Sequence, residues 1–221
     1  MSDYSGHVAA GTGAARRRVT VGGIDVEIVK RSVGPMDNNA YLLTDLNSGE
    51  ALLIDAANDA PALLDLVDGV TVAAIHTTHG HFDHWQALEV LRQATGAPVY
   101  VGPGDQEMME PVADRTAEHG GRLQVGGFEV EFLHTPGHTP GSVCILLRAD
   151  DRHHLFTGDT LFPGGPGNTF GNAEAFARIM GSLRECLFTL PDDTWVYPGH
   201  GDDTTLGAER PHLDEWQERG W

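Results

Sequence analysis

The chain has 221 residues, of which 40% are hydrophobic, and this length and apolar content suit one domain with a sizeable core. It carries 32 acidic residues against 14 basic ones, and the formal charge of −18 repels phosphate backbones and anionic membrane faces. We therefore expect a small-molecule substrate, and we expect neither nucleic acid nor membrane as a partner.

The N-terminal region and the cysteines indicate the compartment. Residues 1–18 lack the apolar core of a signal peptide, and we predict that they form a loose extension before a single domain over 19–221. No run approaches the roughly 18 apolar residues of a membrane span. Cys144 and Cys186 each lie among apolar residues, which favours reduced core thiols over a disulfide. The sequence therefore predicts a cytoplasmic protein.

Hydrophobic patterns predict strands in two batches, with helices between and after them. In chain order, we expect strands at 24–30, 40–44 and 51–55, a helix at 60–67, a strand at 70–78, a helix at 84–95, a strand at 98–102, a hairpin over 122–135 that turns at Gly126–Gly127, strands at 142–148 and 153–159, a helix at 173–190, a strand at 194–200 and a helix at 209–221. This order predicts an α/β domain in which two sheets pack together and helices lie outside.

The stretch "THGHFDHW" (78–85) concentrates metal-binding side chains directly after a predicted strand. His79 and His81 are two residues apart, so in an extended chain both imidazoles face one side. Asp83 and His84 follow where the chain bends, and they can point toward a second position nearby. Zinc binds imidazole nitrogen and carboxylate oxygen at about 2.0–2.2 Å. Four such ligands are too many for one ion that also holds substrate, and they suit the start of two sites.

Further candidate ligands lie at the ends of later strands, beside glycines that allow close approach. His138 stands in "TPGHTPGS", Asp159 in "FTGDTLF" and His200 in "YPGHG". Together with the first cluster, this pattern resembles the metallo-β-lactamase superfamily, and within it glyoxalase II and its short relatives. The resemblance extends from about residue 21 to residue 205 and implies an αββα sandwich of two mixed sheets.

The resemblance also implies roles for single residues. The first metal would be held by three histidines, His79, His81 and His138. The second would be held by Asp83, His84 and His200, and Asp159 would bridge both ions. Asp55 in "LLIDAA" matches the family's early acidic position and would orient a histidine from behind.

The segment "LFPGGPGNTFGN" (161–172) begins two residues after Asp159 and is rich in glycine and proline. We expect this loop to lie over the metals and to contact the substrate. The residues that we expect to take part are Phe162, Asn168, Thr169 and Phe170.

The family chemistry implies a hydrolase with two Zn²⁺ ions, or with a zinc and an iron, in which a bridging hydroxide attacks a carbonyl carbon. Asp83 would orient that hydroxide and take its proton. A thiolate leaves readily because a thiol pKa lies near 8.5, which favours a thioester. The residue bias and "TGDTLFPGGPGNTFG" resemble an actinobacterial branch, which suggests a hydroxyacyl or formyl thioester of mycothiol. Glutathione fits less well, because only about 20 residues with few basic groups follow His200.

Other readings stay open at this point. Persulfide dioxygenases share this fold and the H-x-H-x-D-H string, and they hold a single Fe²⁺ at the positions of His79, His138 and Asp159. A lactonase-like hydrolase and a metal-binding protein without catalysis are further alternatives. Related β-lactamases commonly carry Cys at the position of Asp159 and are typically secreted, so they fit less well. The sequence leaves the oligomeric state open, a homodimer included.

Overall fold

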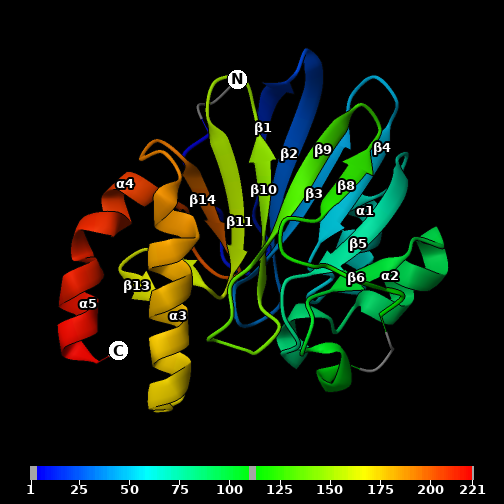
Figure 1. Cartoon of the computed structure of the whole chain (residues 1–221). Coiled ribbons are helices and arrows are strands. Elements are labelled where there is room, and N and C mark those ends of the chain that lie inside the picture. The colour runs from blue at the N-terminus through cyan, green and yellow to red at the C-terminus, as the bar shows by residue number, and fades with distance from the viewer. Residues whose placement is uncertain (1–3, 110–112, 221) are drawn as a thin grey trace.

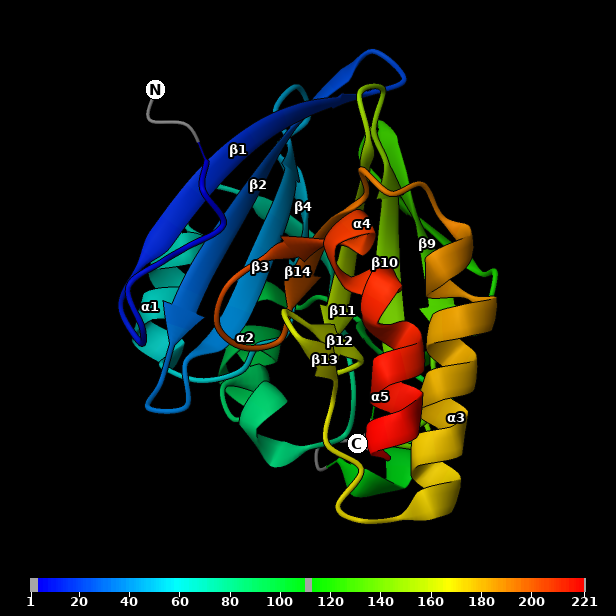
Figure 2. The ribbon, with the colours of Figure 1, turned by 90° about the vertical axis from the view of Figure 1, so that its left-hand side faces the viewer.

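The computed structural model describes residues 4–109 and 113–220. Two β-sheets stack face to face and helices cover both outer faces, as Figure 1 and Figure 2 show from two directions. This arrangement is the predicted αββα sandwich, and the fold prediction is confirmed. Among the described residues, no helix is long and apolar enough to cross a membrane.

The first sheet has seven strands in the order of the chain. They are β1 (Ala14–Val21), β2 (Ile24–Val33), β3 (Asn38–Asp45), β4 (Glu50–Ile54), β5 (Thr71–Thr77), β6 (Val99–Val101) and β7 (Arg115–Thr116). Strands β1 to β4 pair antiparallel, and β4 to β7 pair parallel. Helices α1 (Ala60–Leu66) and α2 (Leu88–Thr95) lie on its outer face.

The second sheet has six strands in the order β15-β14-β11-β10-β9-β8. They are β8 (Arg122–Val125), β9 (Phe128–His134), β10 (Val143–Arg148), β11 (His153–Gly158), β14 (Trp195–Pro198) and β15 (Thr204–Thr205). Helices α3 (Ala173–Glu185), α4 (Leu206–Glu209) and α5 (Leu213–Arg219) cover its outer face. A small hairpin, β12 (Leu161–Phe162) with β13 (Gly165–Pro166), begins the predicted substrate loop.

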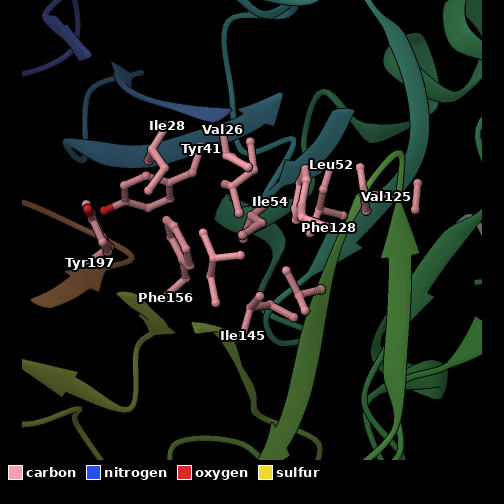
Figure 3. Close-up of a cluster of buried hydrophobic side chains, with 14 of the residues drawn as sticks. Val26, Ile28, Tyr41, Leu52, Ile54, Val125, Phe128, Ile145, Phe156 and Tyr197 are labelled. Carbon is pink, nitrogen blue, oxygen red and sulfur yellow. The ribbon is translucent and has the colours of Figure 1, made fainter. Parts of the chain in front are cut away.

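The alternation of apolar residues along each strand explains the layers. Ile28 packs between the sheets, whereas its neighbour Val29 packs toward α1 and α2. Ile145 likewise faces the first sheet, and Leu146 faces the helices of the second. Because successive strand residues point to opposite faces, each sheet buries both of its surfaces. Figure 3 shows Tyr41 and Ile28 of the first sheet facing Phe156 and Ile145 of the second.

The prediction of a loose extension over residues 1–18 is wrong for residues 14–18. They belong to β1, which pairs with β2 from Ala14↔Arg31 to Val21↔Ile24. The basic residues are compatible with a strand because they alternate in exposure, and the Arg17 guanidinium stacks 3.9 Å from the centroid of the Trp195 ring. Residues 4–13 also make contacts, since the Tyr4 hydroxyl donates to Asp203 at 2.8 Å. Residues 1–3 lie outside the described part of the chain.

Several helix limits differ from the predicted ones. The helix expected from residue 84 begins at Leu88, because Phe82–His84 form a 3-10 turn, and this turn directs the Asp83 and His84 side chains toward one another. The helix expected over 173–190 ends at Glu185 and is followed by a 3-10 turn, Leu187–Thr189. The closing helix is divided into α4, a 3-10 turn at Arg210–His212 and α5.

Candidate metal centre

All the predicted ligands meet at one end of the sandwich, where strands of both sheets end. The loop after β5 carries His79, His81, Asp83 and His84. The loop after β9 carries His138, and Asp159 and His200 follow β11 and β14. Each side chain is therefore positioned by a strand end rather than by a long flexible loop.

The ligands form overlapping clusters whose ligand atoms lie within 4.8 Å of one another. We call His79, His81 and His138 the first cluster, and Asp83, His84 and His200 the second cluster. In the first cluster, His79 Nε2 lies 3.1 Å from His81 Nδ1. Two atoms bound at about 2.05 Å to one tetrahedral zinc ion lie about 3.3 Å apart. This spacing therefore fits a common ion.

The second cluster has similar spacings. His84 Nε2 lies 3.2 Å from His200 Nε2 and 3.5 Å from Asp83 Oδ2. Asp159 stands between the clusters, with Oδ2 3.5 Å from His138 Nε2 and also 3.5 Å from His200 Nε2. Its other oxygen lies 3.4 Å from His84 Nε2. One carboxylate thus reaches both groups of ligands.

Hydrogen bonds on the outer side of the histidines fix which nitrogen faces the centre. His84 Nδ1 donates to Asp55 Oδ2 at 2.9 Å, and His138 Nδ1 donates to the Asn168 carbonyl at 2.7 Å. His200 Nδ1 donates to the Met36 carbonyl at 2.8 Å. Since the proton lies on Nδ1, the inward Nε2 keeps a free lone pair, as a metal-binding histidine requires.

Asp55 supports two histidines. Besides His84, its carboxylate accepts hydrogen bonds from the Thr78 amide at 2.7 Å and from the Thr78 hydroxyl at 2.8 Å. That hydroxyl lies 3.2 Å from His79 Nδ1 and can accept its proton. The buried Asp55 therefore lies where the sequence placed an orienting carboxylate, although the relay to His79 through Thr78 was not predicted.

The electrostatics at the centre favour a cation. Burial alone would raise the pKa of the Asp159 carboxyl, but His84 and His200 hold it below its usual value. For His200 the directions are reversed. Burial acts to lower its pKa, but the neighbouring carboxylates of Asp159 and Asp83 raise it to about 10. The space between these carboxylates therefore attracts positive charge, which a divalent ion can supply as well as a proton.

The residues present fit a metal. Within the described part of the chain, the buried atoms His138 Nε2 and Asp159 Oδ1 have no hydrogen-bond partner. An unpaired buried polar atom is costly, and coordination removes that cost. Gly199 also leaves room, because a side chain there would overlap the Asp159 carboxylate and come within 2.7 Å of the His84 ring.

Sequence reasoning missed one side chain that points into the centre. Asn38, at the start of β3, is 1% exposed, and its Nδ2 donates to Asp83 Oδ2 at 2.9 Å. Nothing in the local sequence "DNNAYLL" (37–43) distinguishes Asn38 from Asn39. Asn39 instead donates to the Pro198 and Gly201 carbonyls, on either side of His200.

The predicted substrate loop lies beside the clusters. Phe170 is 70% exposed, and its ring centroid lies 5.8 Å from that of His81. The Phe162 ring lies 6.3 Å from His200. Asn168 contributes its carbonyl to His138, while Thr169 is buried. Next to His138, a cavity of about 380 Å³ is lined by Thr169, Phe170 and Arg178, among others.

Comparison with known proteins defines the family. The family model described as "Metallo-beta-lactamase superfamily" matches residues 33–200. The chain belongs to this superfamily.

Two curated relatives illustrate the similarity. A hydroxyacylglutathione hydrolase of Rhizobium meliloti is 40% identical over 166 residues, which cover 74% of this chain and 62% of the relative. The probable metallo-hydrolase YqgX of Bacillus subtilis is 34% identical, with 80% of this chain and 92% of the relative covered. The superfamily that the sequence resembles is thereby confirmed, and both of these relatives are named as hydrolases.

Solved structures agree on the fold. BLEG-1 B3 metallo-β-lactamase superposes with a TM-score of 0.73 at 28% identity, covering 90% of this chain and 98% of that one. TTHA1623 in a di-iron-bound form gives 0.71 at 35% identity, with 82% and 96% covered. ETHE1 from Myxococcus xanthus gives 0.70 at 31% identity, with 90% and 83% covered.

Proposed function

We propose that the protein is a dinuclear metal-dependent hydrolase that cleaves a thioester of a low-molecular-weight thiol. The observation that carries this proposal is the pair of ligand clusters joined by Asp159, with oxygen-to-nitrogen distances of 3.4–3.5 Å to both. The relative from Rhizobium meliloti, a hydroxyacylglutathione hydrolase, supports thioester chemistry.

In this proposal, the first cluster would hold one ion, the second cluster would hold another, and Asp159 would contribute to both sites. Two zinc ions, or a zinc and an iron, are the expected cofactors, and the di-iron-bound relative supports iron as a constituent. When bound, such ions supply a water of pKa near 7 and polarise a carbonyl. The protein's own residues then have to orient the water, accept its proton and seat the thioester.

Asp83 is the residue that we assign to the water. Burial acts to raise the pKa of its carboxyl, but His200, His84 and Asn38 lower it below the usual value, so Asp83 stays ionised. The Asn38 amide holds one of its oxygens at 2.9 Å. As the water oxygen bonds to the carbonyl carbon and the carbon–sulfur bond breaks, Asp83 receives the water's proton and the thiolate leaves.

The surface around the clusters indicates what kind of thiol fits. Three exposed large hydrophobic residues lie next to the ligands. The Met36 carbonyl accepts a hydrogen bond from His200, Phe82 stands between His81 and Asp83 in the sequence, and the Phe170 ring contacts His81. Together with the net charge of −18, this apolar rim disfavours a highly anionic carrier. We therefore propose a carrier of low net charge, with mycothiol as the candidate, and a hydroxyacyl or formyl group as the acyl part.

A mononuclear iron persulfide dioxygenase is the second candidate. His138 Nε2 lies 3.5 Å from Asp159 Oδ2. His79 belongs to the first cluster with His138, and its ligand atom also lies within 4.8 Å of those of His84 and Asp159. Two histidines and one carboxylate around open positions suit iron and dioxygen. The cytoplasmic location and the absence of nucleic-acid and membrane partners stay predictions.

A substrate panel tests these proposals. The purified protein, with its metals counted, is assayed with lactoyl and formyl thioesters of mycothiol and of glutathione, a lactone, a β-lactam and a glutathione persulfide. We expect kcat/KM to be highest for a thioester. Oxygen uptake with the persulfide and no thioester hydrolysis would overturn the proposal, and a preference for the lactone or the β-lactam would assign a different hydrolase.

A further inference from the structure

A buried carboxylate outside the predicted site connects two of the ligand loops. Asp105 follows β6 and has no solvent exposure. Its Oδ2 accepts hydrogen bonds from the Gly80 amide at 2.8 Å and from the Thr139 hydroxyl at 2.6 Å. Its Oδ1 accepts one from the Gly141 amide at 2.7 Å.

These donors belong to the loops that carry the first cluster. Gly80 stands between His79 and His81, while Thr139 and Gly141 follow His138. The His79 loop comes from the first sheet and the His138 loop from the second. Asp105 is therefore a bridge across the sandwich, placed behind the three histidines.

The local packing is built around this carboxylate. A Cβ atom on Gly141 would lie 2.6 Å from Asp105 Cγ, so only glycine fits there. While the Gly80 amide donates to Asp105, the Gly80 carbonyl accepts a hydrogen bond from the Trp85 indole at 3.0 Å. The backbone between His79 and His81 is thus held from two directions.

The energetics indicate that Asp105 is more than a packing residue. Among the described residues, the hydrogen-bond partners of its carboxylate are two amides and a hydroxyl, none of which carries a charge. A buried carboxylate without a cation is costly unless several donors satisfy it. An apolar residue would avoid that cost, but it could not hold two loops in one register.

We propose that Asp105 is a positioning residue that sets the geometry of the first metal site by fixing the His79–His81 loop against the His138 loop. The inference rests on the proposed function only in that the first cluster binds a metal. It does not depend on whether the reaction is thioester hydrolysis or persulfide oxidation.

The substitution Asp105→Asn tests this role, because it keeps the shape and replaces one acceptor by a donor. That donor would face the Gly141 amide or the Gly80 and Thr139 donors. Loss of an outer partner of metal ligands typically lowers metal affinity about 10- to 100-fold. We expect a loss of that size for Zn²⁺ at one of two sites, measured by competition with a chromophoric chelator, and an altered visible spectrum of the cobalt-substituted protein.

The matched control is Asp45→Asn. Asp45 is a carboxylate with 2% exposure that accepts hydrogen bonds from the Gly127 amide, the Asn47 amide and the Ser48 hydroxyl, each at 2.8 Å. It likewise connects loops of the two sheets, at the other end of β3 from Asn38. We expect Asp45→Asn to lower stability while Zn²⁺ affinity stays within about twofold of the wild type, since Asp45 is remote from the ligands.

Each outcome has a defined meaning. Equal zinc affinities in wild type, Asp105→Asn and Asp45→Asn would overturn the inference, and so would equal losses in both variants. If Asp105→Asn does not fold, Thr139→Val removes one donor only, and we expect a smaller loss at the same site. A wild type that binds no metal contradicts the proposed function itself, whereas two bound ions with an unaffected variant contradict only the role of Asp105.

Discussion

At the scale of single residues, the site depends on side chains that hold the proposed metal ligands in place and are not ligands themselves. Asp55 adopts a positive φ of 56° at the end of β4, a conformation that aspartate tolerates better than most residues. This bend brings its carboxylate to Thr78 and His84 at once. Since a correctly held imidazole binds metal more tightly, the strained backbone serves the metal centre.

We predict that Asp55→Asn weakens zinc binding by the second cluster about 10- to 100-fold. The Thr78 amide and His84 Nδ1 donate to different oxygens of the Asp55 carboxylate, and an asparagine has only one acceptor oxygen to offer them. Asp59→Asn is the control: Asp59 also has a positive φ, of 50°, and caps α1, and asparagine serves equally well there. Isothermal titration of both variants with Zn²⁺ checks this. Equal affinities in the two variants would contradict the role given to Asp55.

His76 gives a prediction about acid stability. It is fully buried on β5 and stacks on Phe132 at 5.5 Å, and burial lowers its pKa to about 4, although Asp55 acts in the opposite direction. Its unfolded pKa is about 6.5, so its neutral form stabilises the fold fully above pH 6.5 and this stabilisation is lost as the pH falls toward 4. At pH 4.5 the loss is about 2–3 kcal/mol.

The substitution His76→Phe keeps an aromatic ring and removes the titration. We expect the metal-free variant to lose about 2–3 kcal/mol less stability than the metal-free wild type between pH 7.5 and pH 4.5. Denaturant unfolding at both pH values measures the difference. Parallel losses in the two proteins would show that His76 does not contribute to acid unfolding.

At the scale of elements, polar residues on β2 and β3 hold the loop that carries His200. The buried Lys30 ammonium donates to the Gly201 carbonyl at 2.6 Å, to Asp203 Oδ1 at 2.7 Å and to the Gly6 carbonyl at 2.9 Å. The Tyr41 hydroxyl donates to the Pro198 carbonyl at 2.6 Å. The N-terminal segment, β2 and the last ligand loop are therefore joined at one cation.

We predict that Lys30→Met destabilises the protein by about 3–5 kcal/mol, because Asp203 would remain buried without its cation. Arg16→Ala on the neighbouring strand is the control. Its ion pair with Glu27 spans 2.6 Å, but the Arg16 side chain is 64% exposed, so we expect a change of about 0–1 kcal/mol. Chemical denaturation gives both values, and a small effect of Lys30→Met would show that the loop is held by Asn39 and Tyr41 instead.

The elements also show where sequence reasoning reaches its limit. The hairpin at Gly126–Gly127 and most central strands were predicted correctly, because turn glycines and alternating apolar residues are local signals. Strand β1 was missed because its three arginines suggest a solvated tail, whereas Arg17 packs on the rings of Trp195 and Tyr4. Such packing involves residues far apart in the chain, and no local pattern reports it.

The same distinction applies to the candidate site. His79, His81, His138 and the other proposed ligands could be predicted because they follow strand ends in glycine-rich loops. Asn38, Asp105 and Lys30 could not, because their importance depends on which loop the fold places beside them. A single asparagine, aspartate or lysine in a sequence carries no sign of its partner.

At the scale of the whole molecule, the metal centre joins the two sheets. The first sheet supplies Asp55 and the loop with His79, and the second supplies the loops with His138, Asp159 and His200. Figure 2 shows the two sheets side by side, with α3, α4 and α5 over the outer face of the second sheet. We therefore expect metal binding to stabilise the packing of the two sheets against each other, and not one loop alone.

We predict that metal removal lowers stability in proportion to the binding free energy. With free zinc at about 1,000 times its dissociation constant, one site contributes about 4 kcal/mol to the folded state. The free energy of unfolding with and without a chelator measures this contribution, and adding zinc back should restore it. If chelation leaves the free energy of unfolding unchanged, the clusters do not bind zinc in the folded protein.

The central claim, two metal ions held by two joined clusters, is tested most directly by counting metals per chain by elemental analysis in the wild type, His84→Ala and His200→Ala. We predict about two ions, zinc or zinc with iron, in the wild type. Each variant should retain about one ion and lose thioester hydrolysis, because both substitutions affect the second cluster. One iron per chain in all three proteins, together with oxygen uptake on a persulfide, would contradict the account.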